Sequence, residues 1–407
     1  MRNFDTLAVR HWLHASVCGL SFFAVVTPAL AADAGNAFNP KISLVLQGNF
    51  ANYDDKSPQL IPGFLLGNES GLRSAGLSLD ETELAIESNI DDLFHGWATI
   101  SLANDNGKTT VNVEEAFINT LTLPYGLAGK GGRFFSDIGY LNRIHSHAWD
   151  FADQPLVYRA FLANQYADDG VQLKWVAPLD LFVEVGGELA RGGAFPGGGD
   201  YRAGVPSKSV FVHVGDDLNA SSSYRAGLSY LRIDDDKRRS GQDVETAFSG
   251  RTGTAIADFV YKWAPNGNPT IHNAILASEV FYRTESGALV FDPNTRAINS
   301  NYHGHQSGFY VQGIYQFAPQ WRVGLRYDRL QSSNVVSNPV PGTALETLAD
   351  NGHDPQRETV MIDWSHSEFS RIRLQYNRDE SRPNGRVDNQ VYLQYIFALG
   401  SHPAHQF

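Results

Sequence analysis

The sequence predicts an all-β protein, namely a transmembrane antiparallel up-and-down β-barrel of about 16 strands. Apolar and polar residues alternate along many short segments; in one of them Trp321, Val323 and Leu325 share a face with Tyr327. Long and short connections also alternate down the chain, as expected of a barrel with long loops at one end and short turns at the other. A globular β-sandwich gives no reason for this regular difference.

Sixteen segments carry the alternation. The predicted strands are 41–53, 80–90, 93–103, 111–122, 130–137, 169–177, 180–190, 207–215, 222–233, 252–263, 271–284, 307–317, 319–330, 357–364, 369–379 and 388–399. The odd-numbered connections are the long ones, so both ends of the sheet should lie at the end with short turns, which faces the periplasm.

Three of the short turns contain Ala-Pro shortly after an aromatic residue, namely Trp175, Trp263 and Phe317. Proline ends a strand because it cannot donate a hydrogen bond to the neighbouring strand. The aromatic residues, with Trp364, are expected in the girdle that such barrels place at the membrane interface.

The first 31 residues differ from the rest. Arg2 and Arg10 precede a short apolar run that ends in Ala29-Leu30-Ala31, a pattern that predicts a signal peptide cut after Ala31. Residues 32–407 are then expected to form a single barrel domain. The only cysteine, Cys18, falls within this predicted leader, so the remainder has no disulfide or thiolate chemistry. The formal net charge of −12 makes nucleic acid a poor partner.

The connection 138–168 is long and unusually rich in large apolar side chains, among them Phe151, Leu156 and Phe161. Such side chains need a surface to pack against, which an exposed loop would not give them. We expect this third extracellular loop to fold into the barrel and narrow it.

The text "VEEAFINTLTLPYGLAGKGGRFFSDIGYLN" (113–142) resembles the phosphate-selective porin family, and "HSHAWDFADQPLV" and "LGSHPAHQF" resemble zinc-regulated outer-membrane proteins of porin size. The resemblance implies a porin in the outer membrane of a Gram-negative bacterium. It further implies a homotrimer, with outer-membrane lipids and the barrel assembly machinery as partners.

If the apolar face meets lipid, the alternate residues line the lumen. Charges of both signs are expected there and on the incoming loop, where they would tune selectivity. The candidate pore-lining or constriction residues are Arg143, Asp150, Asp153, Arg159, Lys174, Glu184, Arg225, Arg322, Arg326, Arg371 and Arg373. Arginines on the neighbouring strands 319–330 and 369–379 are expected to face the acids of the loop across a passage for polar solutes.

Two histidine pairs in odd-numbered connections are candidate metal ligands. His145 and His147, and likewise His303 and His305, stand at positions i and i+2, which share a face in an extended segment. Each pair could bind a divalent ion such as zinc; packing or hydrogen bonding in a loop is the alternative. No other cofactor is expected.

The leading functional prediction is a passive outer-membrane porin for small polar solutes or ions. The alternatives are a zinc-related uptake channel that uses the loop histidines, and a soluble exported β-protein such as a lectin or hydrolase. The sequence contains no G-x-S-x-G, P-loop or H-E-x-x-H motif, and no enzymatic activity is expected.

Overall fold

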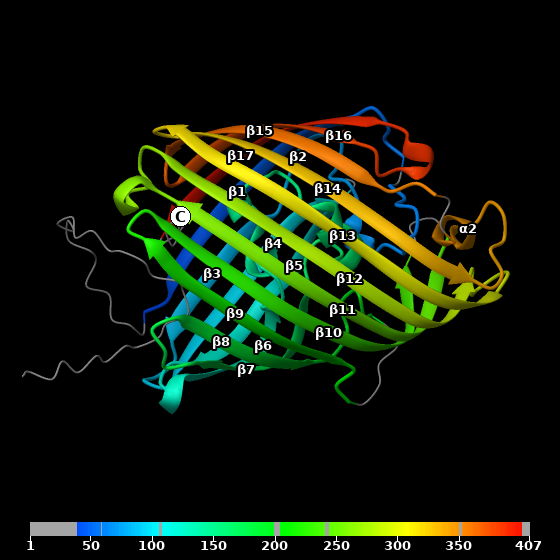
Figure 1. Cartoon of the computed structure of the whole chain (residues 1–407), viewed down its shortest axis with the longest axis horizontal. Coiled ribbons are helices and arrows are strands. Elements are labelled where there is room, and N and C mark those ends of the chain that lie inside the picture. Colours follow the sequence, from blue (N-terminus) through cyan, green and yellow to red (C-terminus); the bar gives the residue numbers. More distant parts are fainter. Residues whose placement is uncertain are drawn as a thin grey trace, which may run out of the picture.

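The computed structural model describes residues 39–57, 59–105, 108–198, 204–240, 244–349 and 352–400, and these form one closed antiparallel β-barrel (Figure 1). The first strand pairs with the last, for example Leu46 with Phe397, so that the wall has no free edge. The predicted fold class is confirmed. The predicted signal peptide, residues 1–31, lies outside the described residues.

The strands are β1 (Lys41–Tyr53), β2 (Gly76–Leu79), β3 (Thr82–Asn89), β4 (Phe94–Asp105), β5 (Lys108–Thr120), β6 (Leu127–Phe135), β7 (Ala167–Val176), β8 (Phe182–Ala190), β9 (Ser207–Asn219), β10 (Ser222–Ser240), β11 (Thr246–Trp263), β12 (Asn273–Phe291), β13 (Ile298–Ala318), β14 (Trp321–Val336), β15 (Gln356–Ser367), β16 (Ser370–Asp379) and β17 (Asp388–Gly400). The helices are α1 (Leu156–Leu162) and α2 (Ala344–Leu348), with 3₁₀ turns η1 (Asn68–Ser70), η2 (Pro124–Gly126), η3 (Leu141–Arg143), η4 (Ser146–Ala148), η5 (Pro265–Gly267) and η6 (Pro383–Gly385).

Strands β2 and β3 are two halves of one wall strand. Both pair with β1, since Leu77 of β2 lies opposite Phe50 and Glu83 of β3 lies opposite Val45. Asp80 and the residue after it interrupt the ladder between the halves. Over the described residues the wall therefore has the sixteen strands that the sequence predicts, with 80–90 starting earlier and being broken.

Strands β10 to β14 are taller than their predictions. They contain 16 to 21 residues, and β13 begins at Ile298 where the sequence predicted a start near residue 307. The extra residues extend the wall at the end that carries the long loops, which we call the loop end; the opposite end is the turn end. The alternation of apolar and polar residues fades there because neither face of the wall needs to be apolar above the membrane. The backbone hydrogen bonds between neighbouring strands nevertheless continue.

The outer face of the wall is apolar. Leu228, Leu325 and Leu374 are each at least half exposed, and Trp321 and Trp364 lie side by side at the turn end. A continuous exposed apolar belt of this kind fits a lipid environment and disfavours the soluble alternative.

Among the described residues, no helix is both long enough and apolar enough to cross a membrane.

Residues 136–166, between β6 and β7, fold into the barrel as predicted; we call them the inner loop. All seven residues of α1 are buried. Its side chains belong to an apolar cluster with Phe281 of β12, Tyr310 of β13 and Leu330 of β14. The large apolar side chains of this loop thus find the partner surface that the sequence demanded on the inner wall.

The first long connection also enters the barrel, which the sequence did not predict. Phe64 packs on Phe161 of the inner loop, with ring centroids 5.6 Å apart. The backbone oxygen of Ser70 accepts hydrogen bonds from Arg159 at 2.7 and 3.1 Å. The two loops therefore support each other inside the lumen.

Candidate functional site: the charged interior of the barrel

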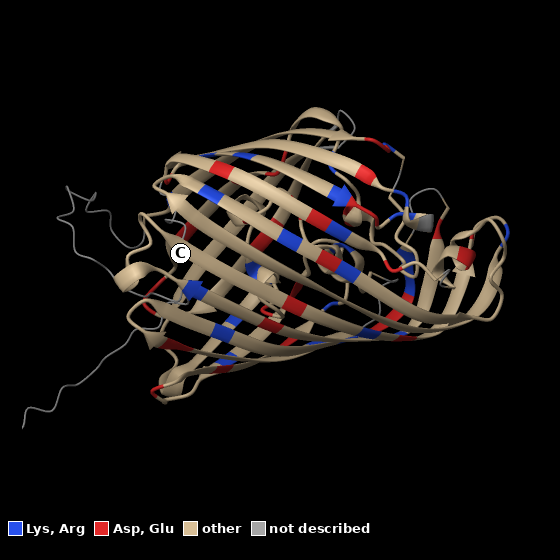
Figure 2. Cartoon of the chain, turned by 45° about the horizontal axis from the view of Figure 1, so that its top comes forward, with Lys and Arg blue, Asp and Glu red and all other residues tan. Residues whose placement is uncertain are grey.

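Charged residues recur along the middle of the wall strands and are not confined to loops (Figure 2). They occupy the inward positions because the outward positions form the apolar belt. The structure places seven of the predicted lumen residues on inward faces: Lys174, Glu184, Arg225, Arg322, Arg326, Arg371 and Arg373. The other four, Arg143, Asp150, Asp153 and Arg159, lie on the inner loop.

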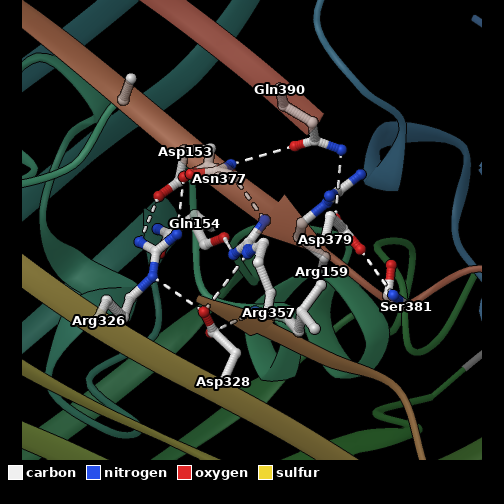
Figure 3. A network of polar contacts seen from close by, with 12 residues as sticks. Asp153, Gln154, Arg159, Arg326, Asp328, Arg357, Asn377, Asp379, Ser381 and Gln390 are labelled. Carbon is white, nitrogen blue, oxygen red and sulfur yellow. Dashed lines mark hydrogen bonds and ion pairs between the residues drawn. The ribbon is translucent and has the colours of Figure 1, made fainter. Parts of the chain in front are cut away.

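Asp153 of the inner loop is the centre of a buried network (Figure 3). Its Oδ1 accepts hydrogen bonds from Arg326 Nη2 at 2.7 Å and Gln375 Nε2 at 2.8 Å. Its Oδ2 accepts from Arg357 Nη1 at 2.8 Å and Asn377 Nδ2 at 3.0 Å. Burial alone would raise the pKa of Asp153, but the two arginines outweigh burial and hold this pKa well below its usual range. One loop carboxylate thus ties β14, β15 and β16 together.

Asp328 of β14 completes this network on the wall side. It accepts from Arg326 Nε at 3.1 Å and lies 3.4 Å from Arg357 Nε, while its other oxygen accepts the backbone N–H of Leu156 at 2.9 Å. Leu156 is the first residue of α1, so the carboxylate also satisfies a free N–H at the helix start. The part of the structure around Asp153 and Asp328 therefore pairs its charges internally.

Two further groups of contacts hold the inner loop. Glu279 of β12 accepts from the hydroxyls of Tyr158 and Tyr310, both at 2.9 Å, and from the backbone N–H groups of Tyr140 and Leu141. Elsewhere Lys174 contacts the loop directly, and Glu184 contacts Lys174. Lys174 Nζ lies 2.9 Å from Asp137 and 3.3 Å from Glu184, and Glu184 also contacts His213 at 3.1 Å.

The expected passage between the arginines of β14 and the acids of the inner loop is absent. Arg322 Nη1 lies 2.9 Å from Asp150, and Arg326 lies 2.7 Å from Asp153. No solute can pass between groups in contact, so that expectation is wrong: the pairs anchor the loop to the wall. Strand β15 also separates β14 from β16, which are therefore not direct neighbours. Arg159 contacts the first loop instead of facing a passage.

A group of cationic side chains lies at the turn end, just inside the wall; we call it the basic rim. It contains Arg143, Arg225, Lys262, Arg322, Arg371 and Arg373. Three carboxylates face it: Arg225 lies 2.9 Å from Asp258, and Arg322 lies 2.9 Å from Asp150 and 2.6 Å from Asp363. Arg143, Lys262, Arg322 and Arg371 are partly exposed to solvent. Among the described residues, six cations thus face these three carboxylates, and Glu279 near Arg225 and Asp137 near Arg143 are the next acids.

A second cluster, the Glu–His cluster, contains Glu83 of β3, Glu114 and Glu115 of β5, and His145 and His147 of the inner loop. His145 Nδ1 lies 3.1 Å from Glu83 and 3.4 Å from Glu114, and its Nε2 lies 3.0 Å from Glu115. His147 Nδ1 lies 2.9 Å from the other oxygen of Glu83. The sequence suggested the histidines but not the glutamates that surround them.

A β-bulge explains how two consecutive glutamates reach one site. The pairing of β4 with β5 shifts between Thr99 and Ile100, which lie opposite Glu115 and Val113, so that Glu114 is the extra residue. A bulge re-aims a side chain that regular alternation would send to the other face. The predicted strand 80–90 supplies Glu83.

His303 and His305 lie elsewhere. The sequence placed them in a loop, but they are in the extended part of β13, on its exposed outward face. His303 Nδ1 lies 3.1 Å from the hydroxyl of Ser286, and His305 Nδ1 lies 3.3 Å from that of Tyr282. The assignment of these histidines to a loop is therefore wrong, because the hydrogen-bond ladder of β13 continues beyond the part in which apolar and polar residues alternate.

No protein-family model matches the chain. An uncharacterised protein of Aquifex aeolicus is 29% identical over 400 residues, covering 91% of this chain and 80% of that protein. Three solved structures share the fold. The outer-membrane channel DcaP of Acinetobacter baumannii has a TM-score of 0.53 at 12% identity and covers 91% of this chain and 100% of its own. A loop-deletion form of OmpT, an outer-membrane protein of Vibrio cholerae, has a TM-score of 0.52 at 13% identity. The match covers 89% of this chain and 100% of that chain.

The anion-selective porin of Comamonas acidovorans has a TM-score of 0.50 at 9% identity, with 89% of this chain and 99% of that chain covered. The fold is that of outer-membrane porins. Identities this low establish the fold and nothing finer. The resemblance to phosphate-selective or zinc-regulated proteins therefore stays a prediction.

Proposed function

We propose that this chain is a passive outer-membrane channel for small polar solutes and that its basic rim favours anions. The observation that carries the proposal is the excess of cations on the rim, where six basic side chains face the carboxylates of Asp150, Asp258 and Asp363, with Glu279 and Asp137 as the next acids among the described residues. In a narrow lumen with low-dielectric walls, such an excess concentrates anions and repels cations. A porin of the same fold from Comamonas acidovorans is described as anion-selective, which is compatible with this sign.

The rim can be tested in planar bilayers. Arg371→Ala removes an inward, partly exposed cation of β16. Arg322→Ala also removes the ion-pair partner of Asp150 and leaves Asp363 with Arg373 alone. The reversal potential in a salt gradient should shift toward cation selectivity for both variants, and more for Arg322→Ala.

A matched control lies on the same strand. Arg378 of β16 points outward, beyond the membrane belt, and pairs with Glu380. Arg378→Ala should leave the reversal potential unchanged. A wild-type channel that prefers cations, or equal potentials in all four proteins, would overturn the proposed selectivity.

We also propose that the channel is a homotrimer that sits in outer-membrane lipid and is inserted by the barrel assembly machinery. A trimer form of OmpT from Vibrio cholerae shares the fold, with a TM-score of 0.51. Light scattering of the protein in detergent, with the detergent mass subtracted, should give three chains per particle. A particle of one chain that remains monomeric after reconstitution would contradict the trimer.

A further inference from the structure

The Glu–His cluster joins the inner loop to the wall at a point that the channel proposal does not use. Glu83 comes from β3, Glu114 and Glu115 from β5, and both histidines from the inner loop. The side chain of Glu83 is only 3% exposed and that of Glu114 10%. Burying several carboxylates together is costly unless a cation compensates them.

The hydrogen bonds fix how the ring of His145 is used. Nε2 lies 3.0 Å from Glu115, and a carboxylate can only accept, so Nε2 carries the hydrogen and donates it. In neutral imidazole the other nitrogen then carries a free lone pair. That atom, Nδ1, is buried and makes no hydrogen bond, although it lies 3.1 Å from Glu83 and 3.4 Å from Glu114.

When His145 is neutral, three electron-pair donors therefore converge on one point, and Glu81 beside Glu114 adds a further buried carboxyl group. Ligand atoms of Glu83, Glu114 and His145 all lie within 4.8 Å of one another. We propose that these three residues form a site for one divalent transition-metal ion of the zinc type. An imidazole nitrogen with two carboxylate oxygens is a donor set that such ions accept, whereas magnesium and calcium prefer oxygen alone.

Glu115 and His147 complete the arrangement as positioning residues. Glu115 holds the ring of His145 through Nε2, and His147 Nδ1 lies 2.9 Å from the Glu83 oxygen that does not face the site. Ligands in metalloproteins are commonly oriented by such outer contacts, a carboxylate on the far nitrogen of the histidine above all. The two histidine rings lie 5.8 Å apart, so they do not chelate as a simple pair.

A proton is the competing occupant. Burial lowers the pKa of His145, but the carboxylates of Glu83, Glu114 and Glu115 outweigh it and raise this pKa well above its ordinary value. A doubly protonated ring would compensate part of the negative charge without any metal. The experiment must therefore measure the metal itself.

Equilibrium dialysis of the full chain in detergent, stripped with chelator and then exposed to Zn²⁺, measures the bound metal directly by elemental analysis. We expect one Zn²⁺ per chain, retained against a large excess of Mg²⁺. Glu114→Gln should lower the affinity at least about tenfold, as should His145→Gln. Glu114→Gln is the gentler variant, since it keeps the size and hydrogen-bonding shape of the side chain.

The exposed pair on β13 supplies the matched control. The double variant His303→Gln/His305→Gln removes two imidazoles from the outer wall and should still bind one Zn²⁺. Absence of zinc from the wild-type chain, undiminished binding by folded Glu114→Gln, or loss of binding in the β13 variant would overturn the site. Metal content is measured independently of conductance, so the site and the channel proposal can fail separately.

Discussion

The inner loop meets the wall at two buried charged places that differ in one respect. Around Asp153, the arginines of β14 and β15 neutralise the carboxylates of Asp153 and Asp328, and amide side chains complete the hydrogen bonds. In the Glu–His cluster, three carboxylates surround His145 and no lysine or arginine side chain is paired with them among the described contacts. The first place neutralises its own charges, whereas in our proposal a cation from solution completes the second.

The difference shows that the same loop can be fastened in two ways. Arginine holds its charge permanently and binds carboxylates in fixed geometry, so the Asp153 network needs no ion from solution. A histidine–carboxylate site depends on what solution supplies, and this makes the loop's attachment at β3 and β5 adjustable. In metal-free buffer, removing a carboxylate should therefore lower the stability of the protein at the Asp153 network and raise it at the Glu–His cluster.

The largest effect is expected from Asp153→Ala. It removes one of the two carboxylates that Arg326 and Arg357 share and leaves them with Asp328 alone. Breaking one partner of a buried pair costs about 3–5 kcal/mol. Denaturant unfolding in detergent, together with limited proteolysis of the inner loop, should report a less stable protein and a cleavable loop. Unchanged stability and an intact loop would show that the network is not what holds it.

A smaller effect of the opposite sign is expected from Glu114→Gln in chelator. Two like charges about 4 Å apart repel by about 4 kcal/mol at an effective dielectric constant of 20, and partial compensation by His145 leaves a gain of about 1 kcal/mol. The same unfolding measurement should show stabilisation relative to wild type. With saturating Zn²⁺ the order should reverse, because the wild type binds Zn²⁺ more tightly and therefore gains more binding free energy.

No reversal with zinc, or a loss of stability in chelator, would mean that Glu114 acts as an ordinary buried hydrogen-bonding partner. The two places would then not differ, since both would neutralise their charges without an ion from solution.

The smallest effect is expected at an exposed ion pair. Arg329 and Asp354 lie 2.7 Å apart at the loop end, and each side chain is 40% exposed. Asp354→Ala should cost at most about 1 kcal/mol and less in high salt, because water and ions screen the pair. A cost as large as that of Asp153→Ala would show that burial is not what separates the two kinds of pair.

The alternation of 321–328 and its counterparts was enough to predict the strand number and the inward and outward faces, because a strand in a barrel wall has lipid on one side and water on the other. The apolar content of 138–168 was likewise enough to predict a loop that folds inward, since Phe161 and its neighbours had to be buried. His145 was a candidate from its spacing alone.

The partners of these residues were beyond the sequence. Periodicity is a local property, but whether Arg326 faces a passage or touches Asp153 depends on how far the loop reaches after the whole barrel has closed. The bulge beside Thr99 that brings Glu114 to His145 breaks the very rule by which faces are assigned. The sequence by itself therefore determined the wall and its two faces. Only the tertiary structure decided which charges meet, because those contacts join segments separated by more than two hundred residues.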